Sequence, residues 1–218
     1  MDFIEFAMES MPALLQGTWI TLELWIISII LGTALGLLLA LCRVYGSRTI
    51  YFLSTAYIEL FRGTPQLVQM FIIYLGLPDI GIVLKPIVAA SISIGLNTAA
   101  YQAEYFRGAI LSVDIGQMLA ARALGMKKAE AILKIILPQA IRMVIPQWSN
   151  EVILELKMTS VGFAIGVSEL MAQANAIGFT TFRYFEVFAL AAIIYLIIVT
   201  FFSSLLDLLE YKIKIPGL

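Results

Sequence analysis

The chain has 218 residues, of which 61% are apolar and 13% are charged. A soluble domain usually carries about 25% charged residues, so this composition excludes an ordinary soluble domain and a disordered chain and leaves the membrane class. The 14 Lys and Arg residues nearly balance the 15 Asp and Glu residues, which gives no electrostatic footprint for nucleic acid. His is absent and Cys42 is the single cysteine, which excludes haem ligation by His, His-based triads and an internal disulfide.

The first sixteen residues differ from the rest of the chain. They carry Asp2, Glu5 and Glu9 but no Lys or Arg, whereas a secretory signal peptide begins with positive charges. Their apolar residues follow a helical spacing. We therefore predict that residues 1–16 form a short amphipathic helix on the membrane surface, ahead of a transmembrane domain over residues 17–218.

Five stretches are long and apolar enough to cross a bilayer, which takes roughly 20 residues of α-helix. They predict an all-α membrane protein with about five transmembrane helices. Residues 158–184, between the last two stretches, are mixed in character and predict short surface helices or a re-entrant segment. The predicted spans are residues 17–41, 49–77, 86–106, 136–156 and 185–209.

Positive residues orient these spans, because Lys and Arg stay on the cytoplasmic side. They follow the first, third and last spans, and the opposite side has only Lys85 and Arg183. Five spans then place the N-terminus outside and the C-terminus in the cytoplasm. The residues assigned to the cytoplasmic side are Arg43, Arg48, Arg107, Arg122, Lys127, Lys128, Lys134, Lys212 and Lys214.

One large cytoplasmic loop is expected over residues 108–135. Asp114 is followed three residues later by Gln117, a pattern that resembles a capping box and predicts a helix start near Ile115. Gly125 predicts the end of that helix, and a second helix would start near Lys127. The pattern fits a docking element for another protein or an amphipathic loop on lipid headgroups, and composition alone favours neither.

Polar side chains inside the predicted spans mark a candidate transport path. A charge at the bilayer centre costs about 2.5–3.5 kcal/mol, so such residues usually face a protein interior or a water-filled cavity. Contacts that only join helices are the alternative. Together the polar side chains of these spans offer acceptors for an ammonium group and donors for a carboxylate. The candidates are Asn97, Tyr101 and Glu104, which share one helix face, and Glu151, Glu155, Lys157, Thr159 and Ser160.

The second span is broken near its middle. Glu59 and Arg62 are three residues apart, and an ion pair that neutralises both charges at a bend is the favoured interpretation. In the alternative, Pro65 begins a half-helix that Thr64 caps, and the free N–H groups of this half-helix face an anionic part of a substrate. Gly63 lies in the same break.

Several stretches resemble one family. The run LAARALGMKKAEAILKIILP (residues 119–138) resembles the EAA loop of ABC-importer permease subunits. ELFRGTPQLVQMFIIYLGLP (59–78), GLNTAAYQAEYFRGAI (95–110), LKMTSVGFAIGVSEL (156–170) and TFRYFEVF (181–188) are similar to the polar amino-acid permeases of type I ABC importers, the His, Gln, Glu, Arg, Lys and opine group. The resemblance implies the MetI-like permease fold in a prokaryotic inner membrane.

The resemblance also implies partners. A second permease, identical or related, would complete the translocation path, and an external binding protein would deliver the amino acid. Two cytoplasmic ATPase subunits would each receive one EAA loop through Gln117, Leu119, Ala120, Ala121, Arg122 and Gly125, with Leu119 standing where the motif has Glu. A P-loop needs a Gly-Lys dipeptide, and this chain has none. We therefore expect a non-catalytic subunit without cofactor or metal, whose partner binds ATP and Mg.

The substrate class is suggested by one carboxylate. Most family members, by resemblance, have an apolar residue where Glu155 stands, one helical turn from Glu151. Two neighbouring anions in a low dielectric repel each other, so a cation is required beside them. Lys157 is one candidate, and the side chain of an Arg, Lys or His substrate is the other. An ion-coupled secondary transporter or channel subunit remains the rival function, although no inverted repeat is visible.

Overall fold

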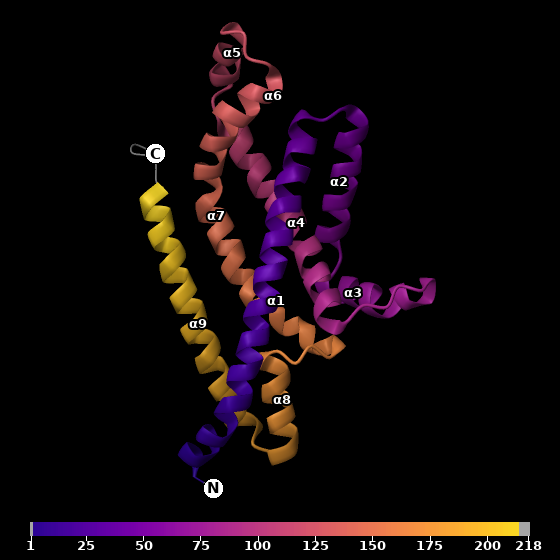
Figure 1. Ribbon diagram of the computed structural model, residues 1–218, viewed down its shortest axis with the longest axis vertical. Helices are drawn as coiled ribbons and strands as arrows, with labels where there is room; N and C mark the ends of the chain where they lie inside the picture. Colours follow the sequence, from indigo (N-terminus) through magenta and orange to yellow (C-terminus); the bar gives the residue numbers. More distant parts are fainter. Residues whose placement is uncertain (1, 214–218) are drawn as a thin grey trace.

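The computed structural model describes residues 2–213, which fold into an elongated bundle of helices without a strand (Figure 1). Most helices run along the long axis of the bundle. In chain order they are α1 (Phe3–Tyr45), α2 (Arg48–Gly63), α3 (Gln66–Phe71), η1 (Ile72–Gly76), η2 (Leu77–Ile80), α4 (Pro86–Ser112), α5 (Ile115–Ala123), α6 (Lys128–Ala131), η3 (Ile132–Ile136), α7 (Leu137–Met158), η4 (Thr159–Ile165), α8 (Leu170–Thr181) and α9 (Tyr184–Ile213).

Each of the five predicted apolar stretches is helical. They correspond to α1, to α2 with α3, and to α4, α7 and α9. Of these, α1 and α9 are long and apolar enough by themselves to cross a bilayer. The stretch before α9 forms η4 and α8, which confirms the expectation of short helices there.

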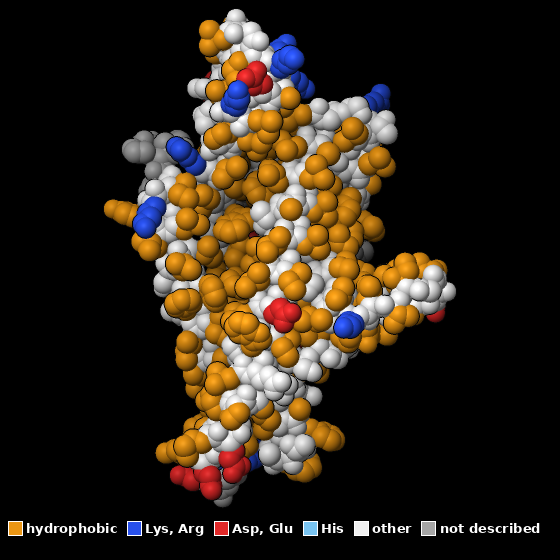
Figure 2. Space-filling view, viewed as in Figure 1, with side chains coloured by type: hydrophobic (Ala, Val, Ile, Leu, Met, Phe, Trp, Pro, Cys, Tyr) orange, Lys and Arg blue, Asp and Glu red, His pale blue; other side chains and the backbone are white. Residues whose placement is uncertain are grey.

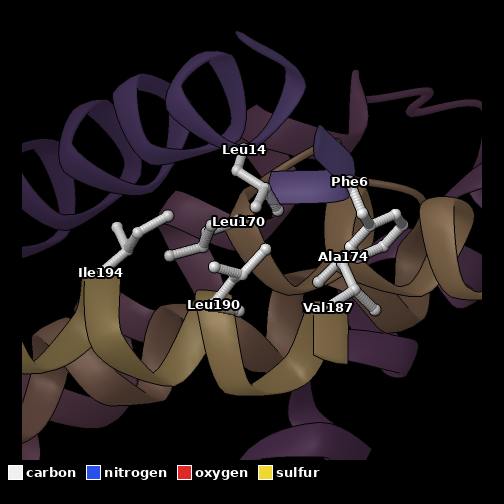
Figure 3. Close-up of a cluster of buried hydrophobic side chains, with 8 residues drawn as sticks. Phe6, Leu14, Leu170, Ala174, Val187, Leu190 and Ile194 are labelled. Carbon is white, nitrogen blue, oxygen red and sulfur yellow. The ribbon is translucent and has the colours of Figure 1, made fainter. Parts of the chain in front are cut away.

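The N-terminal segment differs from its prediction. Helix α1 begins at Phe3 and continues without a break through residue 16, although Pro12 lies inside it. Phe6 and Leu14 are buried against Leu170 of α8 and Val187 of α9, as Figure 3 shows. The segment is therefore the continuous start of α1, packed on α8 and α9 through Phe6 and Leu14, while Ile4, Met8 and Leu15 stay exposed.

Helix α1 packs most extensively against α4, and small residues make this contact possible. A Cβ atom on Gly36 would lie 2.9 Å from the Cβ of Gln102, and one on Gly95 would lie 2.7 Å from Leu31. Small residues at such spacing let two backbones approach closely, which supplies packing where lipid offers no hydrophobic drive. This contact fixes the position of α4, which carries half of the polar residues discussed below.

The break in the second span is real. Helix α2 ends at Gly63, and α3, η1 and η2 continue as an arm that points away from the bundle (Figure 1). The Thr64 hydroxyl donates to the carbonyl of Leu60 at 2.8 Å, and α3 receives no side-chain cap. The expectation that Thr64 caps the half-helix was therefore wrong: its side chain folds back onto the end of α2.

Charged side chains are separated along the bundle (Figure 2). Lys and Arg gather at the end that holds α5 and α6, and Asp and Glu gather at the opposite end, beside the N-terminus. This distribution agrees with the predicted orientation, in which the loop between α4 and α7 is cytoplasmic. Lys214, one of the assigned cytoplasmic residues, lies outside the described residues.

Candidate functional site

A cavity of about 200 Å³ lies where α3, α4 and α7 meet. Helix α4 contributes one polar face to it, and the second half of α7 contributes two carboxylates. Of the residues predicted for the path, Asn97, Tyr101, Glu151 and Glu155 line this cavity. Sequence reasoning missed the rest of the wall, which is made of Gln66, Thr98, Tyr105, Leu154 and Met158.

The two carboxylates are buried to a similar extent but are not equally bonded. Glu151 accepts a hydrogen bond from the hydroxyl of Tyr105 at 3.1 Å. Glu155 is 2% exposed, and neither of its carboxylate oxygens has a hydrogen-bond partner within residues 2–213. Thr98 lies beside this carboxyl group without reaching hydrogen-bond geometry. A buried carboxylate without a partner is costly, so Glu155 is a strong candidate for contact with a ligand.

Lys157 does not supply the missing cation. Its side chain is exposed, and it forms no ion pair with a carboxylate of the described chain. Thr159 and Ser160 also face away from the cavity, since their hydroxyls donate to the carbonyls of Leu156 and Lys157 at 2.7 and 2.8 Å. Lys157 is still within α7 and is turned from Glu155 by roughly 200°, whereas Thr159 and Ser160 lie beyond the end of α7, in the turn of η4.

Glu104 is likewise not part of the cavity. It accepts from Arg107 at 2.7 and 3.0 Å and pairs with Arg43, which comes from α1. Helical spacing predicted a face shared with Asn97 and Tyr101, but only those two line the cavity, and a cation from another helix pairs with Glu104. Glu104 therefore joins α1 to α4, the alternative that sequence reasoning had left open for such residues.

Asn97 has a bracing contact as well as a place in the wall. Its amide donates to the carbonyl of Phe61 at 3.1 Å and to the side chain of Gln69 at 3.0 Å. The Gln69 amide in turn donates to Phe61 at 2.8 Å and to the Thr64 hydroxyl at 2.7 Å. Side-chain amides thus satisfy the carbonyls that the break between α2 and α3 frees, and they hold the arm against α4.

The predicted ion pair at the break, which was the favoured interpretation, is not formed. Among the described residues no ion pair joins Glu59 to Arg62. The guanidinium of Arg62 instead lies 5.5 Å from the centre of the Tyr101 ring, in a cation–π arrangement. Since Tyr101 lines the cavity, Arg62 lies close to the site and not in a separate bend.

Several of the missed residues could have been found from helical spacing. Tyr105 is four residues beyond Tyr101 and eight beyond Asn97, Thr98 is three before Tyr101, and Met158 is three beyond Glu155. Gln66, on the arm, had no such signal. Its place in the wall depends on the direction of the arm, which is a tertiary feature.

The loop between α4 and α7 has the predicted form. The side chain of Asp114 caps α5 by accepting from the N–H of Gly116 at 2.6 Å, and α5 begins at Ile115. Gly125 has a φ of 85° and ends the helix, as expected for a left-handed stop, and α6 begins at Lys128. Arg122 closes this turn by donating to the carbonyl of Met126 at 2.7 Å.

The outer face of α5 is open to a partner. Leu119 is 63% exposed and Leu124 is 85% exposed, whereas Ala121 is buried against the bundle. Gln117, Ala120 and Arg122 are also exposed. Lys134 donates to Glu130 at 2.7 Å, and this contact holds the pKa of the Glu130 carboxyl below its usual range. The loop therefore presents apolar side chains at the end of the bundle where basic residues gather (Figure 2).

Comparisons with known proteins agree with this geometry. The chain belongs to the family of binding-protein-dependent transport system inner membrane components, whose sequence profile matches residues 32–215. The probable amino-acid permease protein YxeN of Bacillus subtilis (strain 168) is 41% identical, over 97% of this chain and 96% of that protein. The octopine transport system permease protein OccM of Rhizobium radiobacter is 40% identical, over 95% and 89%. The arginine transport system permease protein ArtQ of Bacillus subtilis (strain 168) is 34% identical, over 93% of each chain.

Solved structures agree as well. A chain from an amino acid ABC transporter crystallised with histidines has a TM-score of 0.88 and 37% identity, and the match covers 97% of this chain and 99% of that chain. The inward-facing MetNI methionine ABC transporter, at 21% identity, shares the fold with a TM-score of 0.77 over 94% and 98%. As a family member with this MetI-like fold, the chain is a membrane permease subunit of an ABC transporter, which works with ATPase and permease partners.

Proposed function

We propose that this chain forms, with a second permease that is identical or related, the path by which a basic L-amino acid enters the cell. An external binding protein delivers the amino acid, and separate ATPase subunits drive its passage. The names of the relatives support an amino-acid or opine substrate, and ArtQ and the transporter crystallised with histidines support the basic class.

The pair of Glu151 and Glu155 carries the substrate proposal. Both carboxylates border the cavity of α4 and α7, and Glu155 has no bonded partner within the described residues. An ammonium or guanidinium group in the cavity would satisfy Glu155 and relieve its repulsion with Glu151. Tyr105 in the same wall suits a cation, because aromatic faces attract positive charge, whereas the Tyr101 ring already carries the guanidinium of Arg62.

The membrane topology we propose has five spans: α1, α2 with α3, α4, α7 and α9. The N-terminus is outside and the C-terminus is in the cytoplasm of a prokaryotic inner membrane. In this arrangement residues 17–218 form the permease domain. The loop at residues 108–135 faces the ATPase, and the gathering of Lys and Arg at that end supports this orientation.

Coupling to the ATPase is proposed through α5 and the turn at Gly125. The subunit is itself non-catalytic and holds no cofactor or metal, and ATP and Mg are bound by the ATPase chains. The absence of a Gly-Lys dipeptide from the sequence supports this division of labour. Membership in the family of binding-protein-dependent permeases argues against the rival function of an ion-coupled transporter.

The test is uptake of labelled amino acids by the complete importer reconstituted in liposomes. The wild-type protein should transport arginine, lysine or histidine in preference to glutamine and glutamate. Glu155→Gln should lower kcat/KM for the basic substrate at least tenfold, or about 1.4 kcal/mol, since it removes the charge that faces the substrate. Glu23→Gln, which removes an exposed carboxylate of α1 outside the cavity and the loop, is the control and should leave uptake near the wild-type level.

Two results would contradict the proposal. A wild-type preference for glutamate would exclude a basic substrate. Unchanged uptake of the basic amino acid by Glu155→Gln would remove Glu155 from the path. ATP hydrolysis should be measured in parallel, so that a loss of coupling is distinguished from a loss of substrate contact.

A further inference from the structure

Helix α9 is most deeply buried along its first part, and Val199, Phe202 and Leu206 continue its contact with α1 and α7. Its buried residues, Val187, Leu190, Ala191 and Ile194, all precede Tyr195. Further along, Phe202 meets the ring of Trp25 at 4.5 Å, and beyond this contact α9 diverges from α1 and α7 (Figure 1). A gap in packing therefore opens near the C-terminal end of α9, toward the side of the bundle that carries α5 and α6.

A cavity of about 260 Å³ lies in this gap. Its wall includes Leu37 of α1, Phe106 of α4, Trp148 of α7 and Leu209 of α9. Figure 2 shows apolar side chains around the hollow between α9 and α1. The indole N–H of Trp148 donates to the Thr33 hydroxyl at 3.0 Å, so the main polar groups of the wall are bonded to each other. Such a wall favours hydrocarbon over water or an amino acid.

Basic residues stand at the rim of this cavity. Lys212 follows Leu209 by three residues, which puts both on nearly the same face of α9. Arg142 follows Ile141, a wall residue of α7. Both side chains are exposed, and neither forms an ion pair within the described part of the chain. Of the acidic residues in the same stretch of α9, Asp207 is turned from Leu209 by roughly 200°, whereas Glu210 is turned by roughly 100°, the same angle by which Arg142 is turned from Ile141.

We propose that the groove between α9, α1 and α7 binds a phospholipid with an anionic headgroup from the cytoplasmic leaflet. One acyl chain enters the apolar cavity beside Trp148, and the phosphate lies between Arg142 and Lys212. An apolar interior with a basic rim, at the end of the bundle where Lys and Arg gather, matches the two parts of such a lipid. This site is separate from the cavity of Glu151 and Glu155 and goes beyond the proposed transport function.

A second copy of this chain fits the groove less well. In a two-fold symmetric contact the same patch meets itself, so a second copy adds another Arg142 and another Lys212 to the contact instead of an anion. A lipid phosphate instead supplies the opposite charge. The apolar residues that α9 exposes near the groove, such as Leu205 and Leu208, suit the surrounding acyl chains.

The experiment uses the complete importer in lipid nanodiscs and the fluorescence of Trp148. Phosphatidylglycerol and phosphatidylcholine with brominated acyl chains are titrated separately, and the share of Trp148 is the difference between the parent and Trp148→Phe. Half-maximal quenching should require at least fivefold less brominated phosphatidylglycerol than phosphatidylcholine, since one basic residue near a membrane surface contributes roughly that factor. Native mass spectrometry of retained phosphatidylglycerol checks the result without replacing a tryptophan.

Variants locate the two parts of the lipid. Arg142→Gln with Lys212→Gln should make the two lipids quench equally, whereas Arg48→Gln, an exposed change on α2, should keep the preference. Ile141→Phe should fill the cavity and reduce quenching by both lipids, and Ile197→Phe on the outer face of α9 should not. Inorganic phosphate should not compete.

Three outcomes would overturn the proposal. Equal quenching by both lipids in the parent would indicate an ordinary lipid-facing surface. No quenching in the assembled importer would indicate that another protein chain covers the groove. A preference that survives the double substitution would place the headgroup elsewhere.

Discussion

Two buried glutamates of the bundle have the same chemistry and opposite surroundings. Glu169, at the start of α8, is fully buried and accepts from the N–H groups of Met171 and Ala172 at 2.8 Å each and from the Tyr195 hydroxyl at 3.2 Å. Glu155, in the wall of the polar cavity, is 2% exposed and has no bonded partner among residues 2–213.

This difference in hydrogen bonding distinguishes a glutamate with a structural role from one that is a candidate for ligand contact. Glu169 caps α8 and ties it to α9, and the backbone beside it is held to α1 because the Thr21 hydroxyl accepts from the N–H of Leu170 at 3.1 Å. Every contact of Glu169 is internal, so no ligand is needed to explain its burial. Both carboxylate oxygens of Glu155 lack a bonded partner among the described residues, which makes Glu155 the better candidate of the two for contact with a ligand.

Replacing Glu169 should have the largest effect on stability. Glu169→Ala leaves two helix N–H groups and the Tyr195 hydroxyl without their acceptor, and we expect the free energy of unfolding to fall by about 2–3 kcal/mol. Unfolding of the purified protein in mixed detergent micelles measures this change. Glu155→Ala is the matched control, and an equal loss in both variants would break the comparison.

Replacing Glu155 by an apolar residue should not destabilise the empty protein. Glu155→Leu removes a buried carboxylate that has no partner, so the free energy of unfolding should stay level or rise by about 1–2 kcal/mol. The same micelle measurement without substrate tests this. A loss of more than about 1 kcal/mol would show that Glu155 makes internal contacts that the structure does not contain.

Tyr105→Phe should have the smallest effect on the free energy of unfolding, because Glu151 has a single hydrogen-bond partner and keeps its own carboxylate. The change removes one hydrogen bond, which we expect to cost about 0.5–1 kcal/mol of unfolding free energy. Tyr57→Phe, which removes the hydrogen bond of another α-helical tyrosine to the carbonyl of Leu96, is a suitable control. No measurable change in either variant would mean that these hydroxyls add little beyond packing.

The amino-acid sequence by itself determined the elements of this protein. Apolar length identifies the helices, since a bilayer-crossing helix needs a long run of apolar residues whatever its neighbours are. Local chemistry also identifies the break before Pro65, the helix start after Asp114 and the stop at Gly125, because proline, capping residues and glycine act on the backbone beside them.

The tertiary structure alone decided what the polar side chains contact. Glu104 belongs to the face of Asn97 and Tyr101 by spacing, yet Arg43 of α1 occupies it. Arg62 lies over Tyr101 instead of joining Glu59, and α8 and α9 pack against a segment that in isolation reads as a surface helix. A long polar side chain bonds to whichever partner another helix brings within about 3 Å, and that partner is distant in the sequence. Helical periodicity therefore predicts the face of a residue, whereas helix packing decides its role.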